Sequence, residues 1–401
     1  DAITLPQYLT NRFATTNPTL KIVCAIIFLI SFTIYVASAF VAGQTVMCAI
    51  IPWFADGHQK LALGVFAVII LAYTFMGGYM AVCWTDFFQG LLMLCAILLV
   101  PISMAASGRF DPTYAGAFAE GVSAFGTSPF DAPAADIISG LGWGLGYFGM
   151  PHILVRFMAI EKPSMVKKSA TVAITWVVLT LGAASAIAIL GRTYLLSDGM
   201  SLAELILPDD RKNIFIVIVQ DMFPSFIAGL LLAAIVAAAM STADSQLLVA
   251  SSSFTSDIYK PILRKGKASD AEVGMVGRIV VVIVSVVAFF IAASDSEWAS
   301  DIMAMVENAW GLFGASFGPV IILSLFWKRL NFQGTLAGVI AGAVVDLGWL
   351  ATLKATTGIY EILPGFIAGL VMAVVVSLIT PAPGAEVEAI FAAATDPNVD
   401  D

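Results

Sequence analysis

A run of oxygen-bearing side chains interrupts one of the most apolar segments of the 401-residue chain. Ser241, Asp244 and Ser245 fall at positions i, i+3 and i+4, so a helix places them on one face. Ala238 lies one turn earlier on this face, and Thr242 lies at its edge. Hydroxyl and carboxylate oxygens are hard ligands that suit Na⁺ better than zinc or copper. The alternative is that the hydroxyls bond their own helix carbonyls and join neighbouring helices.

A second apolar segment carries a signal for a broken helix between residues 139 and 152. Five glycines precede a proline there: Gly140, Gly142, Gly144, Gly146 and Gly149. In a helix interior glycine costs about 1 kcal/mol and proline about 3 kcal/mol relative to alanine. Trp143 and Tyr147 bracket the expected break, and Pro151 follows it. Such breaks free N–H and C=O groups to hold substrates and ions, although glycines also serve close helix packing.

The composition places these segments in a membrane. Hydrophobic residues make up 60% of the chain, charged residues only 12%, and the mean hydropathy is +0.95. Soluble proteins carry about 25% charged residues, and apolar runs of about 20 residues are long enough to cross a bilayer as helices. The sequence therefore predicts an all-α polytopic membrane protein.

Several other protein classes are disfavoured by the same sequence. No basic patch with interleaved aromatic residues supports nucleic-acid binding. His58 and His152 are the two histidines, so a histidine metal cluster is excluded, and the four cysteines lack metal-ligand spacing. No pairing of a nucleophile with a base is visible, and an enzyme is therefore not expected.

The sequence predicts ten transmembrane helices within a single transmembrane domain that covers residues 1–401. These spans are expected at residues 20–43, 60–82, 86–106, 136–158, 168–191, 225–250, 274–294, 302–326, 334–353 and 363–381. Residues 1–19 form a lead-in, residues 382–401 form a tail, and residues 213–222 form a short surface helix. Small residues at 308–319 ("NAWGLFGASFGP") predict an interruption of the eighth span.

The positions of the basic residues predict the orientation. With residue 1 in the cytoplasm, most of the 19 Lys and Arg residues fall on the cytoplasmic side, as the positive-inside rule requires. An even number of spans then places both ends of the chain in the cytoplasm. Asp86 at the start of the third span and Asp244 near the end of the sixth share a depth, which suits a cation site. Capping of a helix N-terminus explains Asp86 equally well.

Several segments resemble those of the sodium/solute symporter family, and most closely its proline-transporting branch. They are "LPQYLTNRF", "SFTIYVASAFVAG", "GG(x)MAVCWTD", "GWGLGYFG(x)PHILVRFMA", "AAAMSTADSQLLVASSS", "DIYK" and "AWGLFGASFGPV". They occur in the family's order and span nearly the whole chain. The resemblance implies a fold of two inverted five-helix repeats with accessory helices, which works by alternating access.

The resemblance also implies a main sodium site on the sixth span. Ala238, Ser241 and Thr242 match its second-repeat half, which binds Na⁺ through backbone carbonyls and the two hydroxyls. In the family the other half comes from the first core helix. The chain would then begin after that helix, as an N-terminally truncated sequence.

A further sodium site is known in some family members. The matching residues here are Asp86, in the family's "WTD" motif, and Ser241, Asp244 and Ser245. Asp244 stands where proline symporters often have a small polar residue. An extra carboxylate there would strengthen a second cation site, or would take up a proton and let H⁺ compete with Na⁺.

Four residues match positions that the family uses for substrate binding or gating. They are Tyr35, Trp143, Tyr147 and Pro151. Tyr35 on its own is more typical of packing. Met150 departs from the pattern, because proline symporters usually have Gln there, and this difference leaves the substrate open.

The resemblance therefore implies Na⁺-coupled uptake of a small solute, foremost L-proline, across the bacterial inner membrane. Na⁺ is the coupling ion, no organic cofactor is expected, and the oligomeric state is open. Alternatives are symport of another amino acid, a pantothenate-like acid or a sugar. A passive channel or a membrane sensor that binds solute without moving it belongs to a different class. The short polar tail and the absence of repeated pore-lining carboxylates disfavour both.

Overall fold

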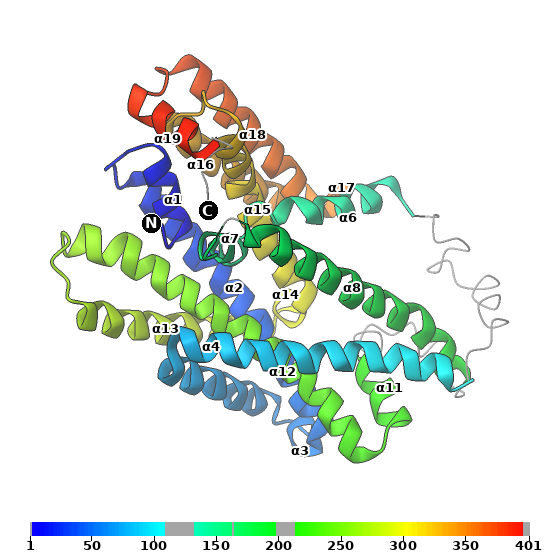
Figure 1. Cartoon of the computed structure of the whole chain (residues 1–401). Helices are drawn as coiled ribbons and strands as arrows, with labels where there is room; N and C mark the ends of the chain where they lie inside the picture. The colour runs from blue at the N-terminus through cyan, green and yellow to red at the C-terminus, as the bar shows by residue number, and fades with distance from the viewer. Residues whose placement is uncertain (1, 109–131, 163, 198–212, 396–401) are drawn as a thin grey trace.

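The computed structural model describes residues 2–108, 132–162, 164–197 and 213–395, and these residues form helices joined by turns (Figure 1). The helices are α1 (Leu5–Arg12), α2 (Thr19–Ile50), α3 (Pro52–Ala55), α4 (Gln59–Ala106), α6 (Ala134–Gly146), α7 (Pro151–Met158), α8 (Met165–Ser197), α11 (Ile214–Met222), α12 (Ser225–Ser253), the π-helix η1 (Phe254–Leu263), α13 (Asp270–Ala292), α14 (Glu297–Ser300), α15 (Ile302–Phe326), α16 (Phe332–Thr352), α17 (Lys354–Thr357), α18 (Ile362–Ile379) and α19 (Ala385–Thr395). The all-helical prediction is confirmed for this part of the chain. Residues 396–401 of the predicted tail lie outside it.

Nine segments of the described residues are long and apolar enough to cross a membrane. They correspond to nine of the ten predicted spans, and the predicted short helix is α11. The remaining predicted span, the fourth along the chain at residues 136–158, contains two shorter helices, α6 and α7. The protein is therefore a multi-pass helical membrane protein, and the segment at 136–158 is not one continuous helix.

The second and third spans are joined without a loop. α4 has 48 residues, a length of about 72 Å at 1.5 Å per residue, which is more than a bilayer core of about 30 Å needs. Figure 1 shows its two halves running in different directions from a sharp bend. Asp86 lies inside α4, so the alternative in which this carboxylate caps a helix N-terminus is wrong.

The predicted break in the fourth span is present. α6 ends at Gly146, and α7 begins at Pro151 after four non-helical residues. Proline suits the first position of a helix because its missing N–H would have no helical partner there. Met150, the N-cap of α7, offers no side-chain hydrogen bond to the helix.

The predicted interruption of the eighth span is wrong. α15 runs unbroken from Ile302 to Phe326, through Pro319. Its small residues instead allow close packing, because a Cβ on Gly314 would lie 2.8 Å from the Cα of Gly146 and one on Gly318 would lie 2.5 Å from the ring of Phe366. Burial of α15 against α6 and α18 outweighs the low helix propensity of glycine.

α2 and α15 lie against each other in the core and position the elements around them. Their phenylalanines meet edge to face, with Phe28 and Phe317 centroids 5.1 Å apart. α12 packs against α2 and α4, whereas α16 and α18 pack against α15. The two ends of the described chain also meet, since the Nη1 of Arg12 in α1 donates to the carbonyl of Val387 in α19 at 3.3 Å (Figure 1).

Candidate functional site

The polar stretch of the sixth span lies within α12, as the sequence predicts. Ser241 donates from its Oγ to the carbonyl of Ala238 at 3.1 Å, so this hydroxyl uses a bond within its own helix in this structure. Thr242 is half-buried. Asp244 is fully buried, and its Oδ2 has no hydrogen-bond partner among the described residues. A buried carboxylate oxygen without a partner is costly, and a cation is one way to satisfy it.

The second predicted group is brought together from two helices. Ser245 on α12 donates from its Oγ to the Oδ2 of Asp86 on α4 at 3.0 Å. The Nη2 of Arg156 on α7 lies 3.7 Å from the same carboxylate oxygen. The sequence analysis did not assign Arg156 to this group, although it stands in the quoted "PHILVRF" motif. The Oδ1 of Asp86 has no hydrogen-bond partner in the described structure.

A cavity of about 500 Å³ opens beside this group. It is bounded by side chains from α4, α7 and α12. Those that carry polar atoms are Asp86, His152, Arg156, Ser245 and Ser252. The cavity gives water and ions room to reach the Asp86–Ser245 pair. Asp244 directly precedes Ser245, one of the residues that line this cavity.

The aromatic residues of the broken span meet two partners that the sequence analysis missed. Trp310 on α15 donates from its Nε1 to the carbonyl of Trp143 at 3.0 Å, and its ring centroid lies 4.9 Å from that of Tyr147. Tyr360, just before α18, lies 5.4 Å from Trp143 between ring centroids. These contacts link positions far apart in sequence, so α6, α15 and the start of α18 together form one aromatic wall. Trp310, which stands among small residues in "NAWGLFG", is the sequence feature that could have indicated this aromatic contact.

The remaining predicted substrate residues, Tyr35 and Pro151, lie in or against the protein interior. Tyr35 on α2 and Trp143 both pack against the hydrophobic core of α2 and α15. Pro151 is buried at the start of α7. Met150 is also fully buried in that core, so the residue that departs from the proline-symporter pattern is a packing residue here. No hydrogen bond among the described residues joins the aromatic group to the polar stretch of α12.

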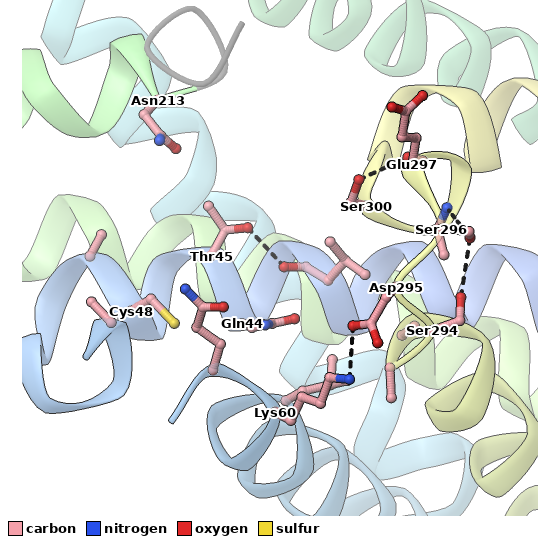
Figure 2. Close-up of a pocket in the computed structure, with 18 residues that line it drawn as sticks. Gln44, Thr45, Cys48, Lys60, Asn213, Ser294, Asp295, Ser296, Glu297 and Ser300 are labelled. Atoms are coloured by element: carbon pink, nitrogen blue, oxygen red, sulfur yellow. Dashed lines mark hydrogen bonds and ion pairs between the residues drawn. The ribbon is translucent and has the colours of Figure 1, made fainter. Parts of the chain in front are cut away.

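A separate polar cavity of about 700 Å³ lies where α2, α4 and the turn before α14 meet (Figure 2). Lys60 and Asp295 form an ion pair across it at 2.8 Å, and Gln44 and Thr45 of α2 face it. Both charged side chains are largely exposed, so the pair contributes little to stability. None of the residues predicted to bind Na⁺ or substrate lines this cavity.

Comparison with known proteins gives results consistent with this arrangement. Residues 1–342 match the profile of the sodium:solute symporter family. Sodium/proline symporters of Staphylococcus aureus, including that of strain Newman, are 40% identical over 406 residues, which is 97% of this chain and 75% of theirs. A solved structure of a Na⁺-coupled sialic acid symporter, bound to substrate and open to the outside, has the same fold. It aligns with a TM-score of 0.68 at 20% identity, over 95% of this chain and 78% of that one.

Proposed function

We propose that this chain, which belongs to the sodium:solute symporter family, transports L-proline. Membership of the family makes sodium-coupled solute symport, rather than catalysis, its class of function. The 40% identity to sodium/proline symporters supports this substrate. The observation that carries the proposal is the broken helix at residues 147–150, which lies beside the aromatic wall of Trp143, Tyr147 and Trp310.

In this proposal the helix break binds the polar groups of proline. Backbone N–H groups at the start of α7 would meet the carboxylate, and the carbonyls of residues 147–149, inside the break, would meet the amine. Trp143 and Tyr147 supply apolar walls for the pyrrolidine ring, and Tyr35 and Pro151 border the site. A substrate of this size binds in a mostly apolar pocket in which a few polar groups point at it. Backbone groups at the helix break are those polar groups in this proposal.

Na⁺ binds on α12 in this proposal, at the carbonyl of Ala238 and the hydroxyls of Ser241 and Thr242. The bond from Ser241 to Ala238 must open or be shared for this to happen. Na⁺ that binds one conformation more tightly shifts the carrier towards it, and by linkage raises its affinity for the solute. Accumulation then follows from the Na⁺ gradient.

A second cation site is proposed at Asp86, Asp244 and Ser245. Its support is the 3.0 Å bond from Ser245 to Asp86 and the unpartnered oxygens on both carboxylates. The adjacent cavity provides a path for the ion.

We place the protein in the bacterial plasma membrane with both ends in the cytoplasm. The positive-inside distribution of Lys and Arg supports this orientation. The hydrogen bond between Arg12 of α1 and Val387 of α19 is consistent with it, because it brings the two described ends to one side.

The test uses the full-length gene product in proteoliposomes, with labelled proline and an imposed Na⁺ gradient. Gly146→Ala puts a methyl group 1.8 Å from the Nε1 of Trp310, whereas Gly144→Ala meets nothing within 4 Å. Where the strain of overpacking, about 1–3 kcal/mol, acts on the proline-binding conformation, the apparent affinity for proline falls by roughly 5- to 150-fold. Gly144→Ala should retain wild-type uptake.

A competition screen identifies the substrate in the same vesicles. Unlabelled proline should displace the label, and other amino acids, pantothenate and sugars should not. Accumulation against the gradient separates a carrier from a channel or a sensor. If another solute accumulates and proline does not, that solute is the substrate and proline is not. Sodium-coupled symport would still be the class of function.

A further inference from the structure

A buried carboxylate lies in α16, far along the chain from the residues discussed above. Asp346 is 1% exposed, and both of its carboxylate oxygens lack a hydrogen-bond partner among the described residues. It stands in an otherwise apolar span. An ionised carboxylate that is removed from water without hydrogen bonds or a countercharge is strongly destabilising, so Asp346 must bind something that removes or balances its charge.

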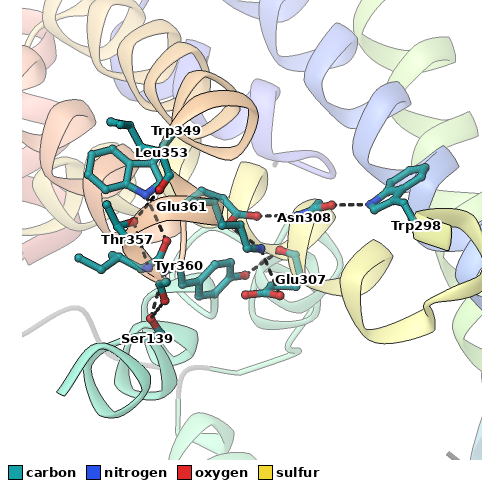
Figure 3. Close-up of polar contacts among 12 residues, drawn as sticks. Ser139, Trp298, Glu307, Asn308, Trp349, Leu353, Thr357, Tyr360 and Glu361 are labelled. Atoms are coloured by element: carbon teal, nitrogen blue, oxygen red, sulfur yellow. Dashed lines mark hydrogen bonds and ion pairs between the residues drawn. The ribbon is translucent and has the colours of Figure 1, made fainter. Parts of the chain in front are cut away.

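The positive charge that acts on Asp346, that of Lys354, is already shared by two other carboxylates. Lys354 of α17 forms ion pairs with Glu361 at 2.8 Å and with Glu307 at 3.2 Å (Figure 3). Glu361 is fully buried and also accepts a hydrogen bond of 2.6 Å from the Nδ2 of Asn308. Two carboxylates therefore hold this ammonium group, and no ion pair joins it to Asp346 among the described residues.

Asp346 is packed closely against α15 and is not part of a metal-binding group in the described structure. A Cβ built on Gly311 of α15 would lie 3.0 Å from the Oδ1 of Asp346, 3.3 Å from the ring of Tyr360 and 3.4 Å from the Cγ of Glu361. Among the residues that the structure describes, no group of three or more His, Cys, Asp or Glu side chains is arranged to hold a metal ion. A proton needs neither space nor a set of ligands.

We propose that Asp346 is a proton-binding site and that it holds a proton in this conformation. The proton comes from bulk water and converts the carboxylate into a neutral carboxylic acid, with no other bond made or broken. The charged and titratable groups near it are Lys354 of α17 and Tyr360 and Glu361 at the start of α18, and Glu307 of α15 lies beyond Lys354 as its second ion-pair partner. Neutral Asp346 leaves Lys354 free to hold both glutamates.

The proton site is connected to the aromatic wall through Tyr360. The Oη of Tyr360 donates to the carbonyl of Glu307 at 2.7 Å, and its backbone N–H donates to the Oγ of Ser139 in α6 at 3.0 Å (Figure 3). If Asp346 loses its proton, it competes for Lys354 and weakens the contacts that hold the segment before α18 against α15 and α6. Uptake by the wild-type protein should therefore fall as the pH rises.

Infrared spectroscopy of the reconstituted protein tests the proposal directly. A protonated carboxylic acid has a C=O stretching band that a carboxylate and an amide lack. Asp346→Asn, which mimics the neutral acid in shape, should remove such a band at neutral pH and should make uptake less sensitive to alkaline pH. Asp295→Asn is the control, because Asp295 is exposed and ion-paired with Lys60, and should leave the acid band unchanged.

A second measurement does not depend on the folding of Asp346→Asn. Wild-type protein and Asp244→Asn are grown with aspartate labelled with ¹³C at the side-chain carboxyl group. The isotope should shift an acid band in both proteins, because Asp346 remains in each. An acid band that is absent from labelled Asp244→Asn, or one that persists unchanged in folded Asp346→Asn, overturns the proposal.

Discussion

Two buried aspartates of this protein lie in contrasting surroundings. Asp244 on α12 has serine neighbours, and its neighbour Ser245 lines a cavity of about 500 Å³ together with a second carboxylate, Asp86. Asp346 on α16 lies among Glu307, Lys354 and Glu361, packed over α15. Both carry carboxylate oxygens that have no hydrogen-bond partner in the described part of the chain.

The difference shows how packing selects a ligand for the same side chain. Hydroxyls beside an open cavity provide several oxygens and a route for water, which a dehydrating Na⁺ needs. A buried site whose neighbours are already ion-paired provides neither, and a proton is the ligand that it suits. The first region is therefore a candidate coupling-ion site, and the second a candidate proton site.

The largest expected effect tests the Na⁺ site proposed on α12. Ser241→Ala combined with Thr242→Ala removes two hydroxyl ligands, and we expect the Na⁺ concentration for half-maximal uptake to rise by about tenfold or more. Thr175→Ala on α8 is the matched control, because its exposed Oγ1 also bonds a carbonyl of its own helix, that of Thr171, at 2.8 Å. Unchanged Na⁺ dependence in the double variant contradicts the assignment.

An intermediate effect separates the two aspartates. Asp86→Asn and Asp244→Asn weaken the second cation site, and a loss of about 1 kcal/mol of Na⁺ binding raises the half-saturating Na⁺ concentration about fivefold. The Hill coefficient for Na⁺ should fall towards 1. Asp346→Asn should leave both quantities unchanged. The comparison fails if Asp346→Asn shifts the Na⁺ dependence as strongly as Asp244→Asn does, or if the wild-type coefficient is already near 1.

The smallest expected effect concerns Arg156. Its guanidinium lies 3.7 Å from Asp86 and is 63% exposed, so the pair is screened by solvent. Arg156→Gln removes a fixed cation that competes with Na⁺, and we expect the half-saturating Na⁺ concentration to fall about twofold. Lys60→Gln removes an exposed ion pair elsewhere and is the control. A rise in the Na⁺ requirement of Arg156→Gln would show that the arginine supports the site instead.

Local chemistry predicted some elements accurately. The helix break at 147–150 follows from glycines and Pro151, whose backbone preferences act within a few residues. The polar face of α12 follows from helical spacing alone. Both depend on near neighbours in the sequence, and both are present in the structure.

Long-range packing accounts for what the sequence did not predict. The same reasoning that found the break predicted one at 308–319, where burial against α6 and α18 instead keeps α15 helical. The contacts of Trp143 with Trp310 and Tyr360 join residues more than a hundred positions apart, which spacing does not reveal. Asp346 had a signal, since an ionisable residue in an apolar span is a functional candidate by default. Its position beside the buried ion pair of Lys354 and Glu361 became visible only in three dimensions.

The contact between α6 and α15 has a consequence for how proteins of this architecture diverge. Gly146 and Gly149 approach α15 so closely that a methyl group would meet Trp310 or the carbonyl of Phe313, while Gly140 and Gly144 have open space beside them. We expect natural variation to spare the first pair and to accumulate at the second. The close contact between α6 and α15 would then be inherited unchanged, while the open side of α6 would tolerate larger residues without a change in transport.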